Sequence, residues 1–219
     1  MPEFTQQLLI GSLLTIALAV CSSILALIFA VFLSLIARSR SLAMRKIANF
    51  YSDFVRGIPE LLFIFLIYYG SATLLTKVYG EYSELGPFWS GVIALGIVFG
   101  AYASEILGAA IDDIPKGQYE ASIALGMTKI KSFTLIILPQ LVRRAIPGMG
   151  NLWLILLKET SLVSVIGLEE LMRKTNIAAG VSHNPMLYYS VGALLYLAIT
   201  SFSEFSFSKL DKRASKYVY

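Results

Sequence analysis

The sequence predicts an all-α integral membrane protein with about five transmembrane helices, and three observations support that fold class. The chain has 219 residues, of which 57% are hydrophobic and only 15% are charged, whereas a soluble domain carries roughly 25% charged residues. Its mean hydropathy is +0.72. Long uncharged stretches alternate with short charged ones, and about 20 apolar residues can cross a bilayer as a helix. We expect one transmembrane domain over residues 1–219.

Each predicted span follows from an uncharged stretch. The first stretch is longer than the ~7–15 apolar residues of a signal peptide, and no positive residue precedes it, so we expect it to be retained as a tilted helix. The third stretch continues past Glu105, and the fourth crosses Lys158 and Glu159. The predicted spans are Phe4–Ala37, Leu61–Thr76, Leu85–Ile111, Ala145–Leu168 and Asn184–Ser203.

One further apolar stretch, Phe133–Val142, has only about half the length that a span requires. Arg143 and Arg144 follow it directly. We therefore predict a separate helix near the cytoplasmic surface that ends at these arginines and leads into the fourth span.

The distribution of basic residues predicts the orientation, because Lys and Arg are enriched in cytoplasmic loops. Five spans place the loops after spans one and three on the same side as the carboxyl terminus. The opposite side holds only Lys77, Arg173 and Lys174. The amino terminus is thus predicted outside and the carboxyl terminus in the cytoplasm. The cytoplasmic set is Arg38, Arg40, Arg45, Lys46, Arg56, Lys116, Lys129, Lys131, Arg143, Arg144, Lys209, Lys212, Arg213 and Lys216.

A polar segment over residues 116–139 interrupts the apolar pattern on this cytoplasmic side. Gln118–Leu125 is predicted to form a short helix with Glu120 in its first turn, where the helix dipole favours an anion. Gly126 can adopt the left-handed conformation that ends a helix, and a second short helix should follow. The small residues Ala121, Ser122 and Ala124 leave room for another protein to approach. A cytoplasmic helical hairpin without a partner is the alternative.

The spacing in this segment resembles the Glu-Ala-Ala signature of the membrane subunits of ABC importers. Four further segments, Arg56–Leu62, Tyr102–Ile106, Ile114–Gln118 and Leu157–Leu162, resemble signature segments of the polar amino-acid permeases among them, especially the branch for histidine, lysine, arginine, ornithine and opines. The residues that this resemblance assigns to ATPase coupling are Glu120, Ala121, Ser122, Gly126, Ile136, Leu138 and Pro139.

The resemblance implies a type I importer fold in a bacterial inner membrane, with a cytoplasmic coupling helix. It also implies a second permease subunit as a homodimer or heterodimer partner, two ATP-binding cassette ATPase subunits and an extracytoplasmic amino-acid-binding protein. The chain departs from the family at Ser122, where a second Ala is usual, and at Gly108, where Arg is frequent. The first change exchanges one small residue for another, and the second affects the expected substrate cavity or its gate.

The chain lacks features expected of an enzyme or of a cofactor-binding protein. Lys131-Ser132 is not preceded by the glycines of a phosphate-binding loop, so ATP and Mg²⁺ are expected on the partner ATPase and no cofactor on this chain. Cys21 and His183 are the only residues of their types, so no metal site is expected. The net charge of +4 follows the membrane topology, and it therefore indicates no nucleic-acid partner.

Charged residues within the predicted spans need an explanation, because a charge at the bilayer centre costs at least ~2.5–3.5 kcal/mol. One hypothesis is mutual neutralisation, for instance of Lys158 by Glu105. The other is a polar cavity for a zwitterion, with Lys158 facing a carboxylate and Glu105 or Glu159 facing an ammonium group. Adjacent helical residues diverge by about 100°, so only one of Lys158 and Glu159 should face that cavity. The candidate substrate-binding residues are Glu60, Tyr102, Glu105, Lys158, Glu159, Thr160 and Ser161.

In the family, an acid at the position of Glu60 tends to accompany basic amino-acid and opine substrates, so the resemblance favours a cationic cargo. A solvated acid at a helix start is the alternative interpretation of Glu60. Three other functions stay open: import of a neutral or acidic polar amino acid or an opine, a secondary carrier that uses Glu105 or Glu159 as a proton site, and a scaffold that transports nothing. The lack of an internal repeat counts against the secondary carrier.

Overall fold

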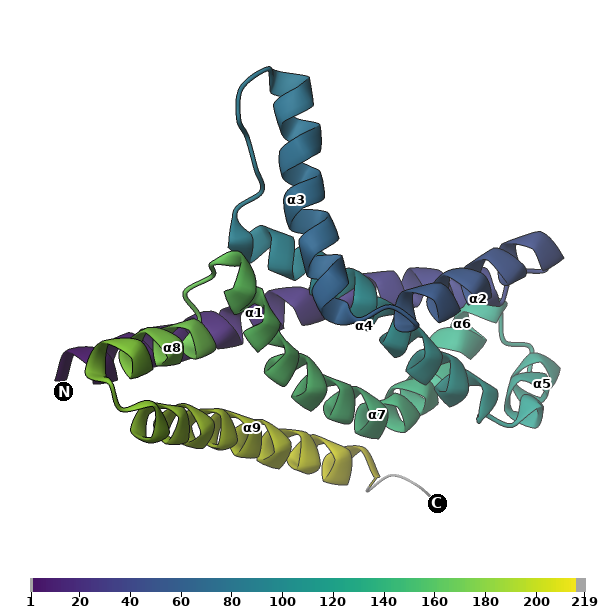
Figure 1. Cartoon of the computed structure of the whole chain (residues 1–219). Coiled ribbons are helices and arrows are strands. Elements are labelled where there is room, and N and C mark those ends of the chain that lie inside the picture. Colours follow the sequence, from purple (N-terminus) through teal and green to yellow (C-terminus); the bar gives the residue numbers. More distant parts are fainter. Residues whose placement is uncertain (1, 216–219) are drawn as a thin grey trace.

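The computed structural model describes residues 2–215, and within them every regular element is a helix (Figure 1). Lys216, which contributes to the predicted charge asymmetry, lies outside the described residues. In chain order the elements are α1 (Pro2–Ala37), α2 (Leu42–Arg56), α3 (Glu60–Tyr79), α4 (Pro87–Asp112), α5 (Lys116–Ala124), α6 (Lys129–Ser132), the π-helical turn η1 (Phe133–Ile137), α7 (Leu138–Glu159), the 3₁₀ helix η2 (Thr160–Ile166), α8 (Leu171–Ser182) and α9 (Pro185–Ser215).

The described part of the chain contains five helical stretches long and apolar enough to cross a membrane, as predicted. The first runs over Phe4–Ala37, the range taken from the sequence, and the next two begin and end within a few residues of the predicted limits. The fifth helix is longer than predicted and continues into the charged residues after Ser203. The number of helices that could span the membrane therefore agrees with the predicted five.

The fourth stretch corrects the prediction of a separate helix at Phe133–Val142. Helical structure is continuous over Lys129–Ile166, because η1 accommodates one wider turn before α7 begins. The arginines do not end the helix. Arg144 instead forms an ion pair with Asp113 at 2.9 Å, at the end of α4, so its charge is satisfied by a neighbouring element.

Two shorter helices occupy the loops that the sequence left without structure. In α2, Ala48, Ser52 and Val55 are buried against the bundle, while Phe50 and Phe54 are exposed. α8 lies in the loop between the fourth and fifth spans and packs on α1 and α9. Both helices contain charged residues, so neither has an uncharged stretch long enough to be recognised as a membrane span.

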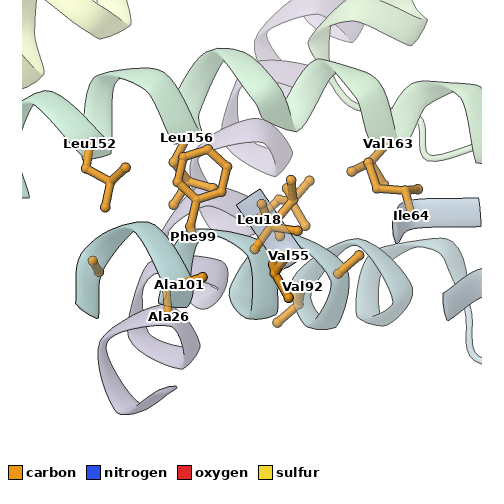
Figure 2. Close-up of a cluster of buried hydrophobic side chains, with 14 of the residues drawn as sticks. Leu18, Ala26, Val55, Ile64, Val92, Phe99, Ala101, Leu152, Leu156 and Val163 are labelled. Atoms are coloured by element: carbon orange, nitrogen blue, oxygen red, sulfur yellow. The ribbon is translucent and has the colours of Figure 1, made fainter. Parts of the chain in front are cut away.

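The core lies where α4 crosses α1 and α7 (Figure 2). A Cβ atom on Gly96 would lie 2.7 Å from Leu25, and one on Gly100 would lie 2.6 Å from Phe29, so only glycine permits this approach of α4 to α1. Phe99, which is 1% exposed, belongs to the same cluster. Water is absent from a bilayer core, so close van der Waals packing between small residues holds such helices together.

α3 stands apart from this bundle (Figure 1). Ile64 is its only buried residue, and its contacts are with α4 and η2. Leu62, Leu66 and Leu74 are exposed along its length. The helix thus presents an apolar surface to its surroundings. The amino-terminal end of α1 and the short helix α5 lie at opposite ends of the molecule (Figure 1), so the polar segment lies far from the start of the first span.

Candidate functional site

The polar segment folds into two short helices joined by a tight turn, as predicted. α5 ends at Ala124, and Gly126 follows with a φ of +77°, the left-handed region in which a side chain is disfavoured. The Thr128 hydroxyl accepts a hydrogen bond from the Lys131 amide at the start of α6. α5 begins at Lys116, so the predicted position of Glu120 in the first turn is wrong, and Glu120 lies in the second turn.

Ser122 has a different role from the one predicted for a small residue facing a partner. It is buried, and its hydroxyl is hydrogen-bonded to that of Ser132. The Met127 amide also donates to the Ser122 carbonyl oxygen at 3.1 Å. Ser122 therefore ties α5 to α6, whereas Glu120 and Ala121 are exposed.

The hairpin exposes several large apolar side chains, together with the charged Glu120, Lys129 and Lys131. The side chains of Leu125 and Ile130 are 82% and 77% exposed, and those of Tyr119 and Ile123 are exposed beside them. Exposed apolar patches of this kind commonly mark interaction sites. The remaining predicted coupling residues lie where η1 meets α7, with Ile136 half-buried and both Leu138 and Pro139 exposed.

Two ion pairs anchor the end of α4, immediately before this hairpin. Asp112 pairs with Arg38, the residue directly after α1, at 3.0 Å, and Asp113 pairs with Arg144 of α7 at 2.9 Å. The hairpin is thus connected through α4 to two other spans.

Three of the predicted substrate-binding residues, Glu60, Tyr102 and Glu159, lie on different elements within electrostatic range of one another, and we call them the convergent cluster. Glu60 lies in the first turn of α3 and Glu159 is the last residue of α7. Both carboxylates act electrostatically on the Tyr102 hydroxyl of α4, and Glu60 also acts on Glu159. All three side chains are half-buried. Two carboxylates and a phenolic hydroxyl brought together in this way can accept hydrogen bonds from a cationic group.

The other residues of that predicted set lie differently. Lys158 is exposed, whereas its neighbour Glu159 is half-buried and lies with Glu60, so Glu159 is the member of the pair that joins the cluster. Thr160 is fully buried and donates to the Leu157 carbonyl oxygen at 2.7 Å. It interacts with Tyr196 and belongs to a different polar network. Ser161 is half-buried.

Glu105 does not pair with Lys158, which corrects the hypothesis of mutual neutralisation. Its carboxylate lies 3.4 Å from the Arg56 guanidinium at the end of α2, and the Ser52 hydroxyl lies at the same distance. The Glu105 side chain is 53% exposed. Because α2 turns back along the end of α1, it supplies a nearer cation than α7 does.

Gly108, the position that departs from the family pattern, is explained by a neighbouring arginine. Arg38 donates to the Gly108 carbonyl oxygen at 2.6 Å. A Cβ atom on Gly108 would lie 3.2 Å from the Arg38 guanidinium. A guanidinium therefore occupies the space beside residue 108, although it belongs to Arg38, directly after α1.

Sequence reasoning missed one buried acid, Glu170, which is 0% exposed. Its carboxylate accepts hydrogen bonds from Thr15 of α1 at 3.1 Å and from Tyr196 of α9 at 2.9 Å. It also accepts from the Arg173 amide and so caps α8. Burial raises the pKa of Glu170, and these hydrogen bonds partly oppose that rise. The sequence shows only an acid in a loop, and no local signal indicates that two distant helices contact it.

Solved structures share this fold. An amino acid ABC transporter crystallised with histidines has a chain that superposes with a TM-score of 0.84 at 30% identity, covering 97% of this chain and 96% of that one. The MetNI methionine ABC transporter in an inward-facing conformation gives a TM-score of 0.78 at 14% identity, over 98% and 99% of the two chains. At 14% identity, the comparison with the methionine transporter supports a shared fold and nothing more.

Curated relatives match over almost their full lengths. The arginine ABC transporter permease protein ArtQ of Haemophilus influenzae is 39% identical over 98% of this chain and 96% of its own. The nopaline transport system permease protein NocQ of Agrobacterium fabrum is 36% identical, over 95% and 91%. The histidine/lysine/arginine/ornithine transport system permease protein HisQ of Escherichia coli is 33% identical, over 97% and 95%.

A family model described as binding-protein-dependent transport system inner membrane component matches residues 26–216. The match contains the polar hairpin, the convergent carboxylates and four of the five apolar spans in full. It confirms the predicted permease subunit, and the expectation that this chain is not itself the enzyme that hydrolyses ATP. The chain belongs to the family of inner membrane components of binding-protein-dependent transport systems.

Proposed function

We propose that this chain forms the translocation path of an ATP-driven importer for a cationic amino acid such as arginine, lysine, histidine or ornithine. The observation that carries the proposal is the convergence of Glu60 and Glu159 on Tyr102. Two carboxylates held together repel each other, and a cation between them relieves that repulsion. The relatives named for arginine and for histidine, lysine, arginine and ornithine support the same substrate class.

The proposed orientation in the bacterial inner membrane places the amino terminus outside and the carboxyl terminus in the cytoplasm. The asymmetry of Lys and Arg between the loops supports it. So does the position of α5, at the opposite end of the molecule from the start of α1 (Figure 1). In this orientation the polar hairpin lies in the cytoplasm, where an ATPase can reach it.

Two of the proposed partners have a surface on this chain that fits them. The exposed apolar side chains of Leu125 and Ile130 on the hairpin suit an ATP-binding cassette ATPase, and that subunit would bind ATP and Mg²⁺. The unpaired apolar face of α3 suits a second permease subunit, identical or different. An extracytoplasmic amino-acid-binding protein would deliver the cargo on the opposite side. We assign no cofactor and no metal to this chain.

The proposed mechanism is alternating access driven from the hairpin. Closure of the ATPase dimer would move α5, and the ion pairs of Asp112 and Asp113 would carry that movement into α1 and α7. Coupling requires that ATP binding favour one position of the hairpin over another. The cargo would meet Glu60 and Glu159 within the path and leave toward the cytoplasm.

Uptake by the reconstituted transporter, assembled with its ATPase, partner permease and binding protein, tests this function. Glu159→Gln should weaken recognition of arginine by about 10- to 150-fold, the range expected for the loss of a charge-assisted hydrogen bond. Glu204→Gln is the matched control, because this exposed carboxylate of α9 lies outside the cluster and its loss should change arginine uptake little. Unlabelled lysine and histidine should compete with arginine.

Other results would redirect the proposal. Competition by glutamine or glutamate but not by lysine would contradict a cationic cargo. Competition by nopaline would favour an opine, in line with the relative named for its transport. Uptake that survives ATP depletion but not loss of the proton gradient would favour a secondary carrier, and equal arginine uptake by the parent and Glu159→Gln would remove that residue from the site.

A further inference from the structure

A polar cavity of about 750 Å³ lies between α1, α2 and α4, on the same end of the molecule as the coupling hairpin. Cavities that hold small molecules commonly enclose about 300–1,000 Å³. One face of α2 contributes Arg45, Asn49, Asp53 and Arg56 to its polar lining. The predicted substrate residue Glu105 also lines it. Glu60 and Glu159 do not belong to its lining, so it is distinct from the convergent cluster.

The charges in this cavity are arranged in pairs. Near the coupling hairpin, Arg38 is bound to Asp112 and to the Gly108 carbonyl oxygen. Deeper along α4, Arg56 is bound to Asp53 at 2.8 Å and to Glu105 at 3.4 Å. Each carboxylate in the lining thus already faces a tethered guanidinium, the chemical group that a cargo such as arginine also carries.

Arg56 lies between the cavity and the convergent cluster. Its charge acts on the Tyr102 hydroxyl, and its partner Glu105 follows Tyr102 by one turn on α4. Only the short loop between α2 and α3 separates Arg56 from Glu60 in the sequence. A cation that leaves Tyr102 along α4 therefore meets Arg56 and Glu105 next.

The contacts of Arg56 are unequal in length. Asp53 and the Ser52 carbonyl oxygen, at 3.3 Å from Nε, hold its guanidinium on its own helix, whereas the longer Glu105 contact reaches across to α4. Arg56 can release Glu105 and still keep its partners on α2.

We propose that this cavity is a weak second binding site for the cationic cargo, and that Arg56 is the tethered cation that gates it. The inference rests on the proposed function. In the absence of cargo, Arg56 neutralises Glu105. An arriving guanidinium or ammonium group displaces Arg56 from Glu105, while the cargo carboxylate is received by Arg45 or Arg38, and the cargo then leaves at the open end of the cavity.

A cysteine-protection experiment on the assembled, detergent-solubilised transporter tests the site. Cys21 is the chain's only cysteine, so Cys21→Ser with Asn49→Cys places a single thiol of this chain in the cavity. Its modification rate by a cationic methanethiosulfonate reagent is measured as arginine is added. Arginine should slow modification, whereas citrulline, which has nearly the same shape but an uncharged side chain, should not. In the control protein, Cys21→Ser with Ser208→Cys, the thiol is exposed on α9, and neither compound should change its modification rate.

Two further substitutions test the binding site and the gate independently. Glu105→Gln should abolish the protection by arginine. Arg56→Gln should lower the half-protecting arginine concentration by about 1.4- to 5-fold, the worth of a partly exposed ion pair, and Arg56→Lys should restore the parent value. Glu204→Gln, a carboxylate on α9 outside the cavity, serves as the matched control.

The outcomes are distinguishable. Equal protection by arginine and citrulline, or protection that survives Glu105→Gln, would overturn the second site. An unchanged or higher half-protecting concentration in Arg56→Gln would overturn the gate. Either failure with intact arginine uptake leaves the proposed function standing, whereas a transporter that does not take up arginine at all would contradict that function first.

Discussion

The turn at Gly126 allows a quantitative test of the coupling hairpin. Gly126 has a φ of +77°, and a Cβ atom built there meets no other atom of this chain within 4 Å. Gly126→Ala therefore adds backbone strain without a steric clash. The left-handed conformation costs an ordinary residue about 1–2 kcal/mol, which reduces the population of the bent hairpin by about 5- to 30-fold relative to competing conformations.

ATP-driven uptake by the reconstituted transporter measures this effect, with the amount of copurified ATPase recorded in parallel. Gly126→Asn should retain more uptake than Gly126→Ala, because Asn tolerates the left-handed region. Gly80→Ala is the matched control: Gly80 has a φ of +75° with the same free space, but it ends α3 outside the coupling segment. Uptake in Gly126→Ala equal to that of the parent would refute the requirement for this turn.

Two other predictions concern stability in detergent. Burial raises the pKa of Glu170 above its ordinary 4.5, so the stability that this group contributes is complete below about pH 4.5 and is lost as pH rises through the raised pKa. Glu170→Gln should remove this pH dependence and cost about 1–3 kcal/mol through unpaired buried donors. A difference in melting temperature between the two proteins that stays constant across pH would contradict this prediction. Gly108→Arg should destabilise the fold by about 1–3 kcal/mol through overpacking against Arg38, and Arg38→Ala in the same chain should recover most of the loss in a thermal-survival assay. A Gly108→Arg protein as stable as the parent would show that Arg38 moves aside freely.

Part of the site could be predicted from the sequence because its signals are local. A helix that must end in a left-handed residue requires glycine or a close substitute, and Gly126 meets that requirement within its own turn. The limits of α5 and the burial of Ser122 were not predictable in the same way. They depend on Ser132, a hydroxyl ten residues away on the following helix.

The sequence by itself determined the number of membrane spans and the turn in the coupling hairpin, because hydropathy and backbone conformation are properties of short segments. Only the tertiary structure decided which charges meet. Arg38 pairs with Asp112 across 74 positions of the chain, and Arg144 pairs with Asp113 across 31. Charge pairing depends on distances of a few ångströms between helices, and helical packing sets those distances.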